Sequence, residues 1–241
     1  MRGIRKSFGS VEALRGVDFH VNAAEIVGLL GDNGAGKSTL IKVLSGLYGA
    51  DAGTFFFRGR RLDWTRSCVS RARDLGIETV YQDRALGLQQ SLWRNVFVGR
   101  HIKGSWGLID VAEERRVTAE LLARMGLGGG RLTPDTRAGV LSGGERQGLA
   151  IGRAMYFDAE LVVLDEPTTA LALSEVDKVL EFICGVRERG KSVVFITHSI
   201  DHVWAVADRF VVLSHGRNAG EWTRGELTLP ELTARLREVA L

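Results

Sequence analysis

The sequence contains very little cysteine and no long apolar run. Its two cysteines, Cys68 and Cys184, lie far apart and belong to no CxxC or Cys/His spacing, so neither a disulfide framework nor a thiolate metal site is expected. This usage fits a reducing compartment. The N-terminal residues lack the apolar stretch of a signal peptide, and no window approaches the roughly 18 apolar residues that span a bilayer. Any role at a membrane is therefore expected to depend on partners.

An excess of charge of one sign is also missing. The 32 basic and 29 acidic residues are mixed along the chain rather than gathered into a tail, and the net charge is only +3. Binding of nucleic acid through charge alone is therefore not expected. The sequence has no internal repeat and no long heptad pattern. Its 241 residues, 45% of them hydrophobic, are typical of a globular protein with one large domain or a core and a smaller subdomain.

Apolar segments whose residue spacing is typical of a strand alternate along the sequence with segments whose spacing is typical of a helix. EIVGLL at residues 25–30 is a short apolar run that stops at Gly31, as a buried strand entering a tight turn does. Apolar residues then recur at spacings of three and four through residues 40–47, which predicts a helix packed on a sheet. Further strands are predicted at 54–59, 77–81, 160–167, 192–198 and 209–217, and helices at 68–75, 110–125 and from a Ser174–Asp177 start to a stop at Gly190. This alternation predicts an α/β fold with a mainly parallel sheet.

The stretch from about residue 83 to residue 140 breaks the alternation. It is mostly helical in pattern, with glycine-rich joints such as GLGGG. It predicts an inserted helical subdomain, which together with the next helix start covers residues 83–150. Residues 1–82 and 151–217 would then form the core of a single domain, and residues 218–241 a C-terminal tail with a helix-like end and no recognisable motif.

The strongest single motif is GDNGAGKST, which matches the spacing G-x-x-x-x-G-K-[ST] between a predicted strand and a predicted helix. Glycines allow the backbone to ring phosphate oxygens with N–H groups, because they reach positive φ and have no Cβ. The lysine would bring a positive charge to the β- and γ-phosphates, and the next hydroxyl would reach Mg²⁺. A chance glycine-rich turn is the weaker alternative. The predicted phosphate-binding residues are Gly31, Asn33, Gly34, Ala35, Gly36, Lys37, Ser38 and Thr39.

LSGGE, Leu141 to Glu145, is a second helix start made of serine and glycine. Ser142 and Glu145 form a capping box, which by itself is ordinary helix chemistry. The N–H groups of Gly143 and Gly144 at the same helix start would also make an anion cradle, because the glycines leave them uncovered. Cap and cradle are compatible, and the residues alone do not say what anion would bind there.

Polar side chains follow three of the predicted strands. Asp165 and Glu166 end LVVLDE, and the carboxyl ends of parallel strands face the ligand crevice. An aspartate there can hold Mg²⁺, and the glutamate can orient or deprotonate an attacking water. An isolated acidic pair would more often serve a helix dipole, but the phosphate loop favours the functional interpretation. Gln82 and His198, each after a strand, would by themselves be loop or structural residues; their positions suit contacts with the metal and with a γ-phosphate.

In this order, GDNGAGKST, Gln82 in VYQD, LSGGE, LVVLDEP and His198 in ITHS resemble the motifs of the ATP-binding-cassette (ABC) ATPases across nearly the whole chain. The resemblance implies a P-loop NTPase (RecA-like) core, an N-terminal antiparallel β subdomain and the inserted helical subdomain. It implies ATP and Mg²⁺, with Ser38, Gln82 and Asp165 around the metal. It also implies that Phe8 in KSFG stacks on adenine.

The resemblance gives the remaining motifs roles as well. Glu166 and His198 become the hydrolytic pair, with Gln82 coupling the site to a membrane partner. In this family two ATPase domains pair head to tail, and LSGGE of one subunit closes over the γ-phosphate held by the other. A homodimer is therefore expected, with the second half of each site formed by Ser142, Gly143, Gly144 and Glu145.

The chain departs from the family pattern in three places. Glu145 stands where glutamine is commoner, and Ala172 replaces the aspartate of a SALD-like turn, which puts communication across the dimer through that turn in doubt. Few residues precede Phe8, so either the first strand is expected to be truncated or the given start is expected to be late. PTTALA, VYQD and SLWRNVFVGR look like segments of bacterial monosaccharide-importer ATPases, many of which have two fused halves where this chain has one.

The leading interpretation is an ATP-hydrolysing subunit that powers the import of a sugar. It would work as a dimer beneath membrane-spanning permease subunits, on the cytoplasmic face of the cell membrane, with an external substrate-binding protein as an indirect partner. One alternative is a soluble ABC ATPase of DNA repair or translation, which the short helical insertion and the absence of a basic run disfavour. Another is a regulatory nucleotide-binding module, which the presence of Lys37, Asp165, Glu166 and His198 disfavours.

Overall fold

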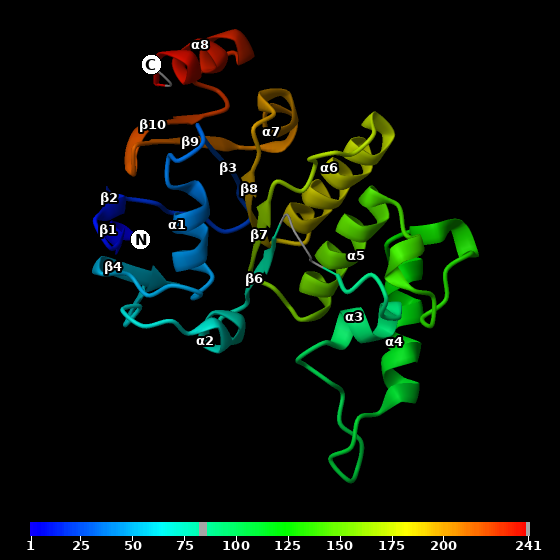
Figure 1. The fold of residues 1–241 in the computed structure, drawn as a ribbon. Helices are drawn as coiled ribbons and strands as arrows, with labels where there is room; N and C mark the ends of the chain where they lie inside the picture. The colour runs from blue at the N-terminus through cyan, green and yellow to red at the C-terminus, as the bar shows by residue number, and fades with distance from the viewer. Residues whose placement is uncertain (82–85, 240–241) are drawn as a thin grey trace.

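Two β-sheets with helices packed around them make up the structure, a computed structural model that describes residues 1–81 and 86–239 (Figure 1). The larger sheet has six strands in the order β10-β9-β3-β8-β7-β6. Strands β9, β3, β8, β7 and β6 are parallel, and β10 is antiparallel to β9. The predicted mainly parallel sheet is therefore confirmed. Its strands are β3 (Ile26–Gly31), β6 (Ile77–Val80), β7 (Leu161–Asp165), β8 (Ser192–Ile196), β9 (Arg209–Ser214) and β10 (Arg217–Thr223).

The smaller sheet is antiparallel and forms the predicted N-terminal β subdomain. Its order is β2-β1-β4-β5, with strands β1 (Arg2–Phe8), β2 (Val11–Val17), β4 (Ala52–Phe57) and β5 (Arg60–Leu62). Helix α1 (Lys37–Leu44) lies between the two sheets (Figure 1). Leu14, Val27, Leu40 and Phe55 belong to one buried cluster, so both sheets and α1 share a hydrophobic core. Burial of this apolar area holds the phosphate loop between the sheets.

The opposite face of the larger sheet is covered by helices α6 (Leu173–Glu188), α7 (Ile200–Val206) and α8 (Leu229–Val239), while α2 (Val69–Asp74) precedes β6 (Figure 1). Val179, Val203 and Leu232 bring these helices into a second buried cluster with the sheet. Gly28 permits the close approach of α7, because a Cβ at this position would lie 2.3 Å from Val203 Cγ2. The predicted tail therefore contains both a strand of the sheet, β10, and a helix anchored on it, α8.

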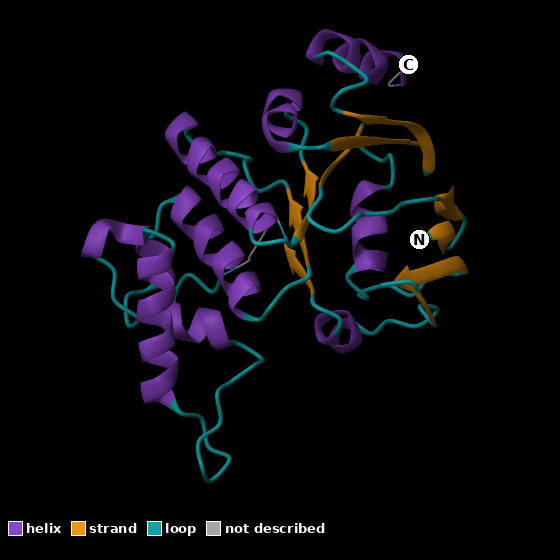
Figure 2. Cartoon of the chain, turned by 180° about the vertical axis from the view of Figure 1, so that it is seen from behind, coloured by secondary structure: helices purple, strands orange, loops and turns teal. Residues whose placement is uncertain are grey.

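The helical subdomain stands to one side of the sheet (Figure 2) and consists of α3 (Leu92–Phe97), α4 (Val111–Arg124), the short 3-10 helices η1 (Leu127–Gly130) and η2 (Ala138–Val140), and α5 (Gly143–Tyr156). It has its own hydrophobic cluster, to which Leu149 belongs. The next residues of the same helix, Ala150 and Ile151, belong to the cluster of the larger sheet. Helix α5 is thus shared by two cores. None of the helices in the described part of the chain is both long and apolar enough to span a bilayer.

The prediction that Ser174 and Asp177 begin a helix is wrong by two residues. Helix α6 begins at Leu173, and its cap is Ala172, whose N–H donates to Glu175 Oε2 at 3.3 Å. Alanine has no side-chain oxygen to return the bond, so only half of a capping box is present. The predicted stop is confirmed, because Gly190 follows the helix with φ 75°. A left-handed glycine at this place ends a helix without steric cost.

Arg209 fixes the start of β9 in a buried polar network. Its guanidinium donates to Glu25 Oε1 and to Glu221 Oε1, each at 2.7 Å, and to the carbonyl oxygen of His20 at 2.7 Å. Arg209 itself is buried. Burial is the largest single effect and would raise the pKa of Glu25, but the hydrogen bonds from Arg209 and from the N–H of Asn22, together with the charge of Arg209, lower the pKa overall. The network therefore stabilises the ionised form of Glu25.

Arg209→Ala is expected to lower the free energy of unfolding by about 3 kcal/mol, because it leaves the mostly buried Glu25 carboxylate without its cationic partner and with only the N–H of Asn22 as a donor. Since the folded-state pKa of Glu25 is lowered, the stabilisation is complete above the unfolded value of 4.5 and is lost as the pH falls through and below it. Urea unfolding of both proteins at neutral pH and in mild acid measures this, and the two curves should converge in acid. Arg116→Ala, which removes an arginine from an exposed pair, is the control and should change little. Equal effects of both substitutions would contradict the prediction.

Candidate functional site

The phosphate loop joins the end of β3 to α1, and two of its glycines are needed for the backbone to fit. Gly31 has φ 141°, and a Cβ there would lie 2.3 Å from the carbonyl oxygen of Leu213. Gly36 caps α1 with φ 103°, and its Cβ would lie 2.8 Å from the carbonyl oxygen of Ala13. Any other residue would force the loop away from β9 and β2. The predicted strand, loop and helix are thus confirmed.

Lys37 is 7% exposed and turned onto its own loop. Its Nζ donates to the carbonyl oxygens of Gly31 at 2.7 Å and of Asp32 at 3.0 Å. Burial lowers the pKa of Lys37, and the negative charges of Glu166, Asp32 and Asp165 oppose this effect. The ammonium group therefore lies close to two carboxylates across the site, in surroundings where charge interactions are stronger than in water.

Asp165, Glu166 and His198 lie at the carboxyl ends of β7 and β8. The N–H of Glu166 donates to the carbonyl oxygen of Ile196 at 3.0 Å, which holds the two strand ends together. Burial raises the pKa of Asp165, and the charge of Glu166 raises it further. The sheet thus holds two adjacent carboxylates where a bound cation would offset their repulsion.

Glu166 is 8% exposed and has φ 52°, an uncommon backbone conformation for a non-glycine residue. Its Oε2 accepts a hydrogen bond from the Thr169 hydroxyl at 3.0 Å. His198 Nε2 lies 3.2 Å from Oε1 of the same carboxylate, without hydrogen-bond geometry, so this oxygen is buried and unpartnered. Such an oxygen is available to accept a proton or a hydrogen bond from water.

A cavity of about 490 Å³ brings these elements together. Most of the predicted residues share its wall, although they come from the phosphate loop and from the ends of two strands. Gln82 was also predicted for this site but lies outside the described residues. The predicted residues that line the cavity are Asn33, Gly34, Ala35, Gly36, Lys37, Ser38, Thr39, Asp165, Glu166 and His198.

Phe8 is not among the residues that line this cavity. Its ring is 43% exposed and packs edge-on against Tyr48, with centroids 5.1 Å apart, while Lys6 Nζ lies 5.6 Å from its centroid. The sequence motifs missed other residues of β2 and of the β9–β10 turn, which carry no distinctive pattern. These are Val11, Glu12, Ala13, Arg15, His215 and Gly216.

The β9–β10 turn reaches the phosphate loop through its backbone. The N–H of Gly216 donates to the carbonyl oxygen of Ala35 at 3.0 Å, and the N–H of Arg15 donates to the carbonyl oxygen of Gly216 at 2.7 Å. A Cβ on Gly216 would lie 2.7 Å from the carbonyl oxygen of Ala13. The turn therefore ties the phosphate loop to β2 of the antiparallel sheet.

The LSGGE segment begins α5, away from the residues that line the cavity. The predicted capping box is present, because the N–H of Glu145 donates to Ser142 Oγ at 3.2 Å and the N–H of Ser142 donates to Glu145 Oε2 at 2.9 Å. A Cβ on Gly143 would lie 2.3 Å from Leu171 Cδ2. The glycines therefore also allow close packing against the loop before α6.

Glu175, which sequence reasoning did not assign to the site, interacts with this helix start. Its pKa is lowered by a hydrogen bond from the Ser142 hydroxyl and by the N–H groups of Ala172, Gly144 and Gly143. Its Oε2 also lies 3.5 Å from where a Gly143 Cβ would stand. The lowered pKa and this distance place the Glu175 carboxylate beside the N-terminus of α5, where a helix start favours negative charge.

Comparison with known proteins places these motifs in one family. The family model described as ABC transporter matches residues 14–169. The chain is 39% identical over 246 residues to the xylose/arabinose import ATP-binding protein of Sulfolobus acidocaldarius, covering 100% of this chain and 94% of that protein. It is 39% identical over 221 residues to a ribose import ATP-binding protein of Chromobacterium violaceum, covering 92% of this chain and only 43% of that protein.

Solved structures of similar fold agree with this assignment. A nucleotide-free ATP-binding cassette from an ABC transporter matches 100% of this chain and 97% of its own, with a TM-score of 0.86 and 24% identity. A dimeric bacterial ABC transporter cassette matches 92% of this chain and 97% of its own, with a TM-score of 0.76 and 23% identity. With a family model over most of its length and a relative aligned from end to end, the chain belongs to the ABC transporter family and has the fold of its ATP-binding cassettes.

Proposed function

We propose that this chain is the ATP-hydrolysing subunit of a membrane importer, that its cargo is a sugar, and that it works as a head-to-tail dimer. The observation that carries the proposal is the single cavity that unites the phosphate loop with Asp165, Glu166 and His198. The relatives named as sugar import ATP-binding proteins support the cargo class. These relatives give no support to the alternative that the chain is a soluble ABC ATPase of DNA repair or translation.

ATP binds with its phosphates in the phosphate loop. Residues of the glycine-rich loop and of the start of α1 line the cavity, and the N–H groups of such a loop and of a helix N-terminus favour phosphate. Lys37 already presents its ammonium group there and exchanges its bonds to loop carbonyls for bonds to phosphate oxygens. Phe8 offers the exposed part of its ring to adenine, beside the apolar Val11 of the cavity wall.

Mg²⁺ fits the donors that are present. Ser38 and Asp165 both line the cavity, and because burial and the charge of Glu166 raise the pKa of Asp165, a bound cation would stabilise its ionised form. Mg²⁺ takes few protein oxygens, and phosphates and water complete its shell. When bound, it neutralises charge on the β- and γ-phosphates. Gln82 is proposed as a further contact, at the point where the metal site communicates with the membrane partner.

Glu166 and His198 act on the water and the γ-phosphate. The unpartnered Oε1 of Glu166 accepts a hydrogen bond from the attacking water and so orients it. Thr169 holds the other oxygen of the carboxylate, which fixes its direction. His198, whose ring nitrogen lies 3.2 Å from Oε1, donates to a γ-phosphate oxygen. A positioned base of this kind contributes about 10²–10⁴ in rate.

The second half of the site comes from the partner subunit. Ser142, Gly143 and Gly144 do not line the cavity of their own chain, although their N–H and hydroxyl groups stabilise the Glu175 carboxylate. In the dimer these groups, together with Glu145 of the same helix start, close over the γ-phosphate bound by the other subunit. The Glu175 carboxylate then has to move away from these hydrogen-bond donors, because the γ-phosphate and the carboxylate compete for them.

The subunit is proposed to sit on the inner, cytoplasmic face of the cell membrane, beneath permease subunits that form the pathway and receive cargo from an external binding protein. Its single domain is proposed to divide at residues 82 and 150, and the change of buried cluster between Leu149 and Ala150 supports the second boundary. Residues 218–241 are assigned as a C-terminal element packed on the core.

Lys37→Ala is expected to abolish measurable ATP binding, because it removes the buried ammonium group that lies on the phosphate loop itself. Titration calorimetry with ATP and Mg²⁺ measures the loss, with circular dichroism to verify folding. Lys178→Ala removes an exposed lysine from α6 and should bind ATP as the unchanged protein does. Binding of wild-type affinity by the Lys37 variant would show that the loop is not the phosphate site.

Glu166→Gln is expected to bind ATP but to hydrolyse it at least about 100-fold more slowly, because the amide cannot take up a proton. ATP that is not hydrolysed keeps the two halves together, so a dimer should accumulate with ATP and Mg²⁺ in size-exclusion chromatography. Glu181→Gln, on the exposed face of α6, is the matched control. Hydrolysis at the normal rate by the Glu166 variant would remove this residue from the mechanism.

Glu175→Gln is expected to favour the ATP-dependent dimer by several-fold, because it removes the charge that competes with the γ-phosphate while keeping the shape of the side chain. The dimer dissociation constant is measured in the Glu166→Gln background by analytical ultracentrifugation, with Glu181→Gln again as control. A weaker dimer would mean that Glu175 supports the cradle rather than competing for it.

A further inference from the structure

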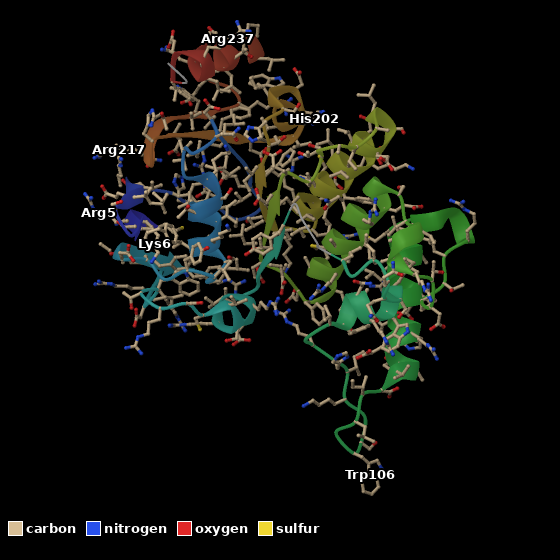
Figure 3. The ribbon with its side chains drawn as sticks, viewed as in Figure 1. Arg5, Lys6, Trp106, His202, Arg217 and Arg237 are labelled. Carbon is tan, nitrogen blue, oxygen red and sulfur yellow. The ribbon has the colours of Figure 1, made fainter. Side chains whose placement is uncertain are left out.

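A hairpin formed by residues 99–110 projects from the helical subdomain, between α3 and α4 (Figure 3). It is a defined structure, held by its own backbone. The N–H of Gly107 donates to the carbonyl oxygen of Gly104 at 3.0 Å and closes the turn, and the N–H of Gly104 donates to the carbonyl oxygen of Leu108 at 2.9 Å. Lys103 and Ile109 face each other in a β-bridge below the turn. Trp106 thus sits on a tight turn.

A buried carboxylate fixes the base of this hairpin to α4. Glu114 is fully buried, and its Oε1 accepts from the N–H of Ile102 at 2.9 Å and lies 3.0 Å from His101 Nδ1. The N–H of Asp110 donates to the carbonyl oxygen of Ile102 at 2.8 Å, and the Asp110 side chain caps α4. The base is therefore anchored to α4 by hydrogen bonds to a buried side chain and by a backbone hydrogen bond.

The tip of the hairpin exposes apolar side chains that a folded protein usually covers. Trp106 is 91% exposed, Leu108 73% and Ile109 46%. In Figure 3 Trp106 stands at the far end of the loop, away from the rest of the chain. Within the hairpin Asp110 is the one acidic residue, and it caps α4 at the base, whereas Lys103 near the turn forms no ion pair with any described residue. The tip is apolar and cationic together.

We propose that this hairpin docks on an anionic lipid bilayer, with Trp106 and Leu108 in the headgroup region and Lys103 against lipid phosphates. The proposal rests on the proposed function only in that the protein works at a membrane. Indole is the aromatic group most suited to this region, because one edge is apolar and its N–H remains hydrogen-bonded. Lysine beside an apolar anchor adds attraction to anionic lipid.

The size of the tip favours lipid over a protein partner. A stable protein interface buries about 800 Å² on each side, whereas a large aromatic side chain supplies about 150–250 Å². The three exposed apolar side chains on this narrow turn supply less than that area. Insertion into a headgroup layer needs no complementary pocket, because the lipids rearrange around the side chain. The contact is expected to be weak and to orient a subunit that its permease partners already hold nearby.

Vesicle sedimentation tests the proposal with the intact chain. The unchanged protein should bind vesicles of phosphatidylcholine mixed with phosphatidylglycerol more strongly than vesicles of phosphatidylcholine alone. Trp106→Ala should lower the partition coefficient about tenfold. Trp106→Phe should retain part of the binding, while the blue shift of tryptophan emission on adding vesicles should disappear. Lys103→Glu should weaken binding several-fold to the anionic vesicles only.

Leu173→Ala provides the control, because Leu173 is 82% exposed but lies at the start of α6. It should bind vesicles as the unchanged protein does. Equal binding by the wild-type and Trp106→Ala proteins would overturn the proposal. A second result would also overturn it. If neither protein binds bare vesicles, but only the wild-type protein binds membranes that contain the permease, the tip docks on protein and not on lipid. ATP hydrolysis in solution, measured on the same proteins, tests the proposed function separately and should not respond to Trp106→Ala.

Discussion

The candidate site depends on one buried ammonium group. Lys37 lies under the phosphate loop, and its ammonium group donates hydrogen bonds to two carbonyl oxygens of that loop. A lysine that has lost most of its water needs compensation from nearby negative charge, and Asp165 and Glu166 provide it across the cavity. These carboxylates in turn repel each other. A phosphate chain with its cation adds both signs of charge at once, so this arrangement of charges favours that ligand over a lone anion.

The sequence predicts the local parts of this site well. GDNGAGKST fixes strand, loop and helix because the glycine positions and the lysine lie within a single turn, where spacing determines geometry. Asp165 and His198 could be placed at one edge because parallel strands end together. Fold class and the helical insertion also follow from periodicity and its interruption.

Contacts between distant segments were not predictable in the same way. The β9–β10 turn and β2 line the cavity through backbone and unremarkable side chains, which no motif marks. Glu175 was overlooked because its partners at the start of α5 lie about thirty residues earlier in the chain. The prediction that a helix starts at Ser174 was wrong for a related reason. A serine followed three residues later by aspartate resembles a cap, but the loop from β7 has already begun the helix at Leu173.

The β9–β10 turn has a consequence for the thermodynamics of nucleotide binding. Gly216 bonds to Ala35 in the phosphate loop, and Arg15 bonds to Gly216, so the loop is braced from the antiparallel sheet before any ligand arrives. The conformational entropy of the loop is therefore lost during folding and not during association. Binding of the phosphates should accordingly carry a small ordering entropy.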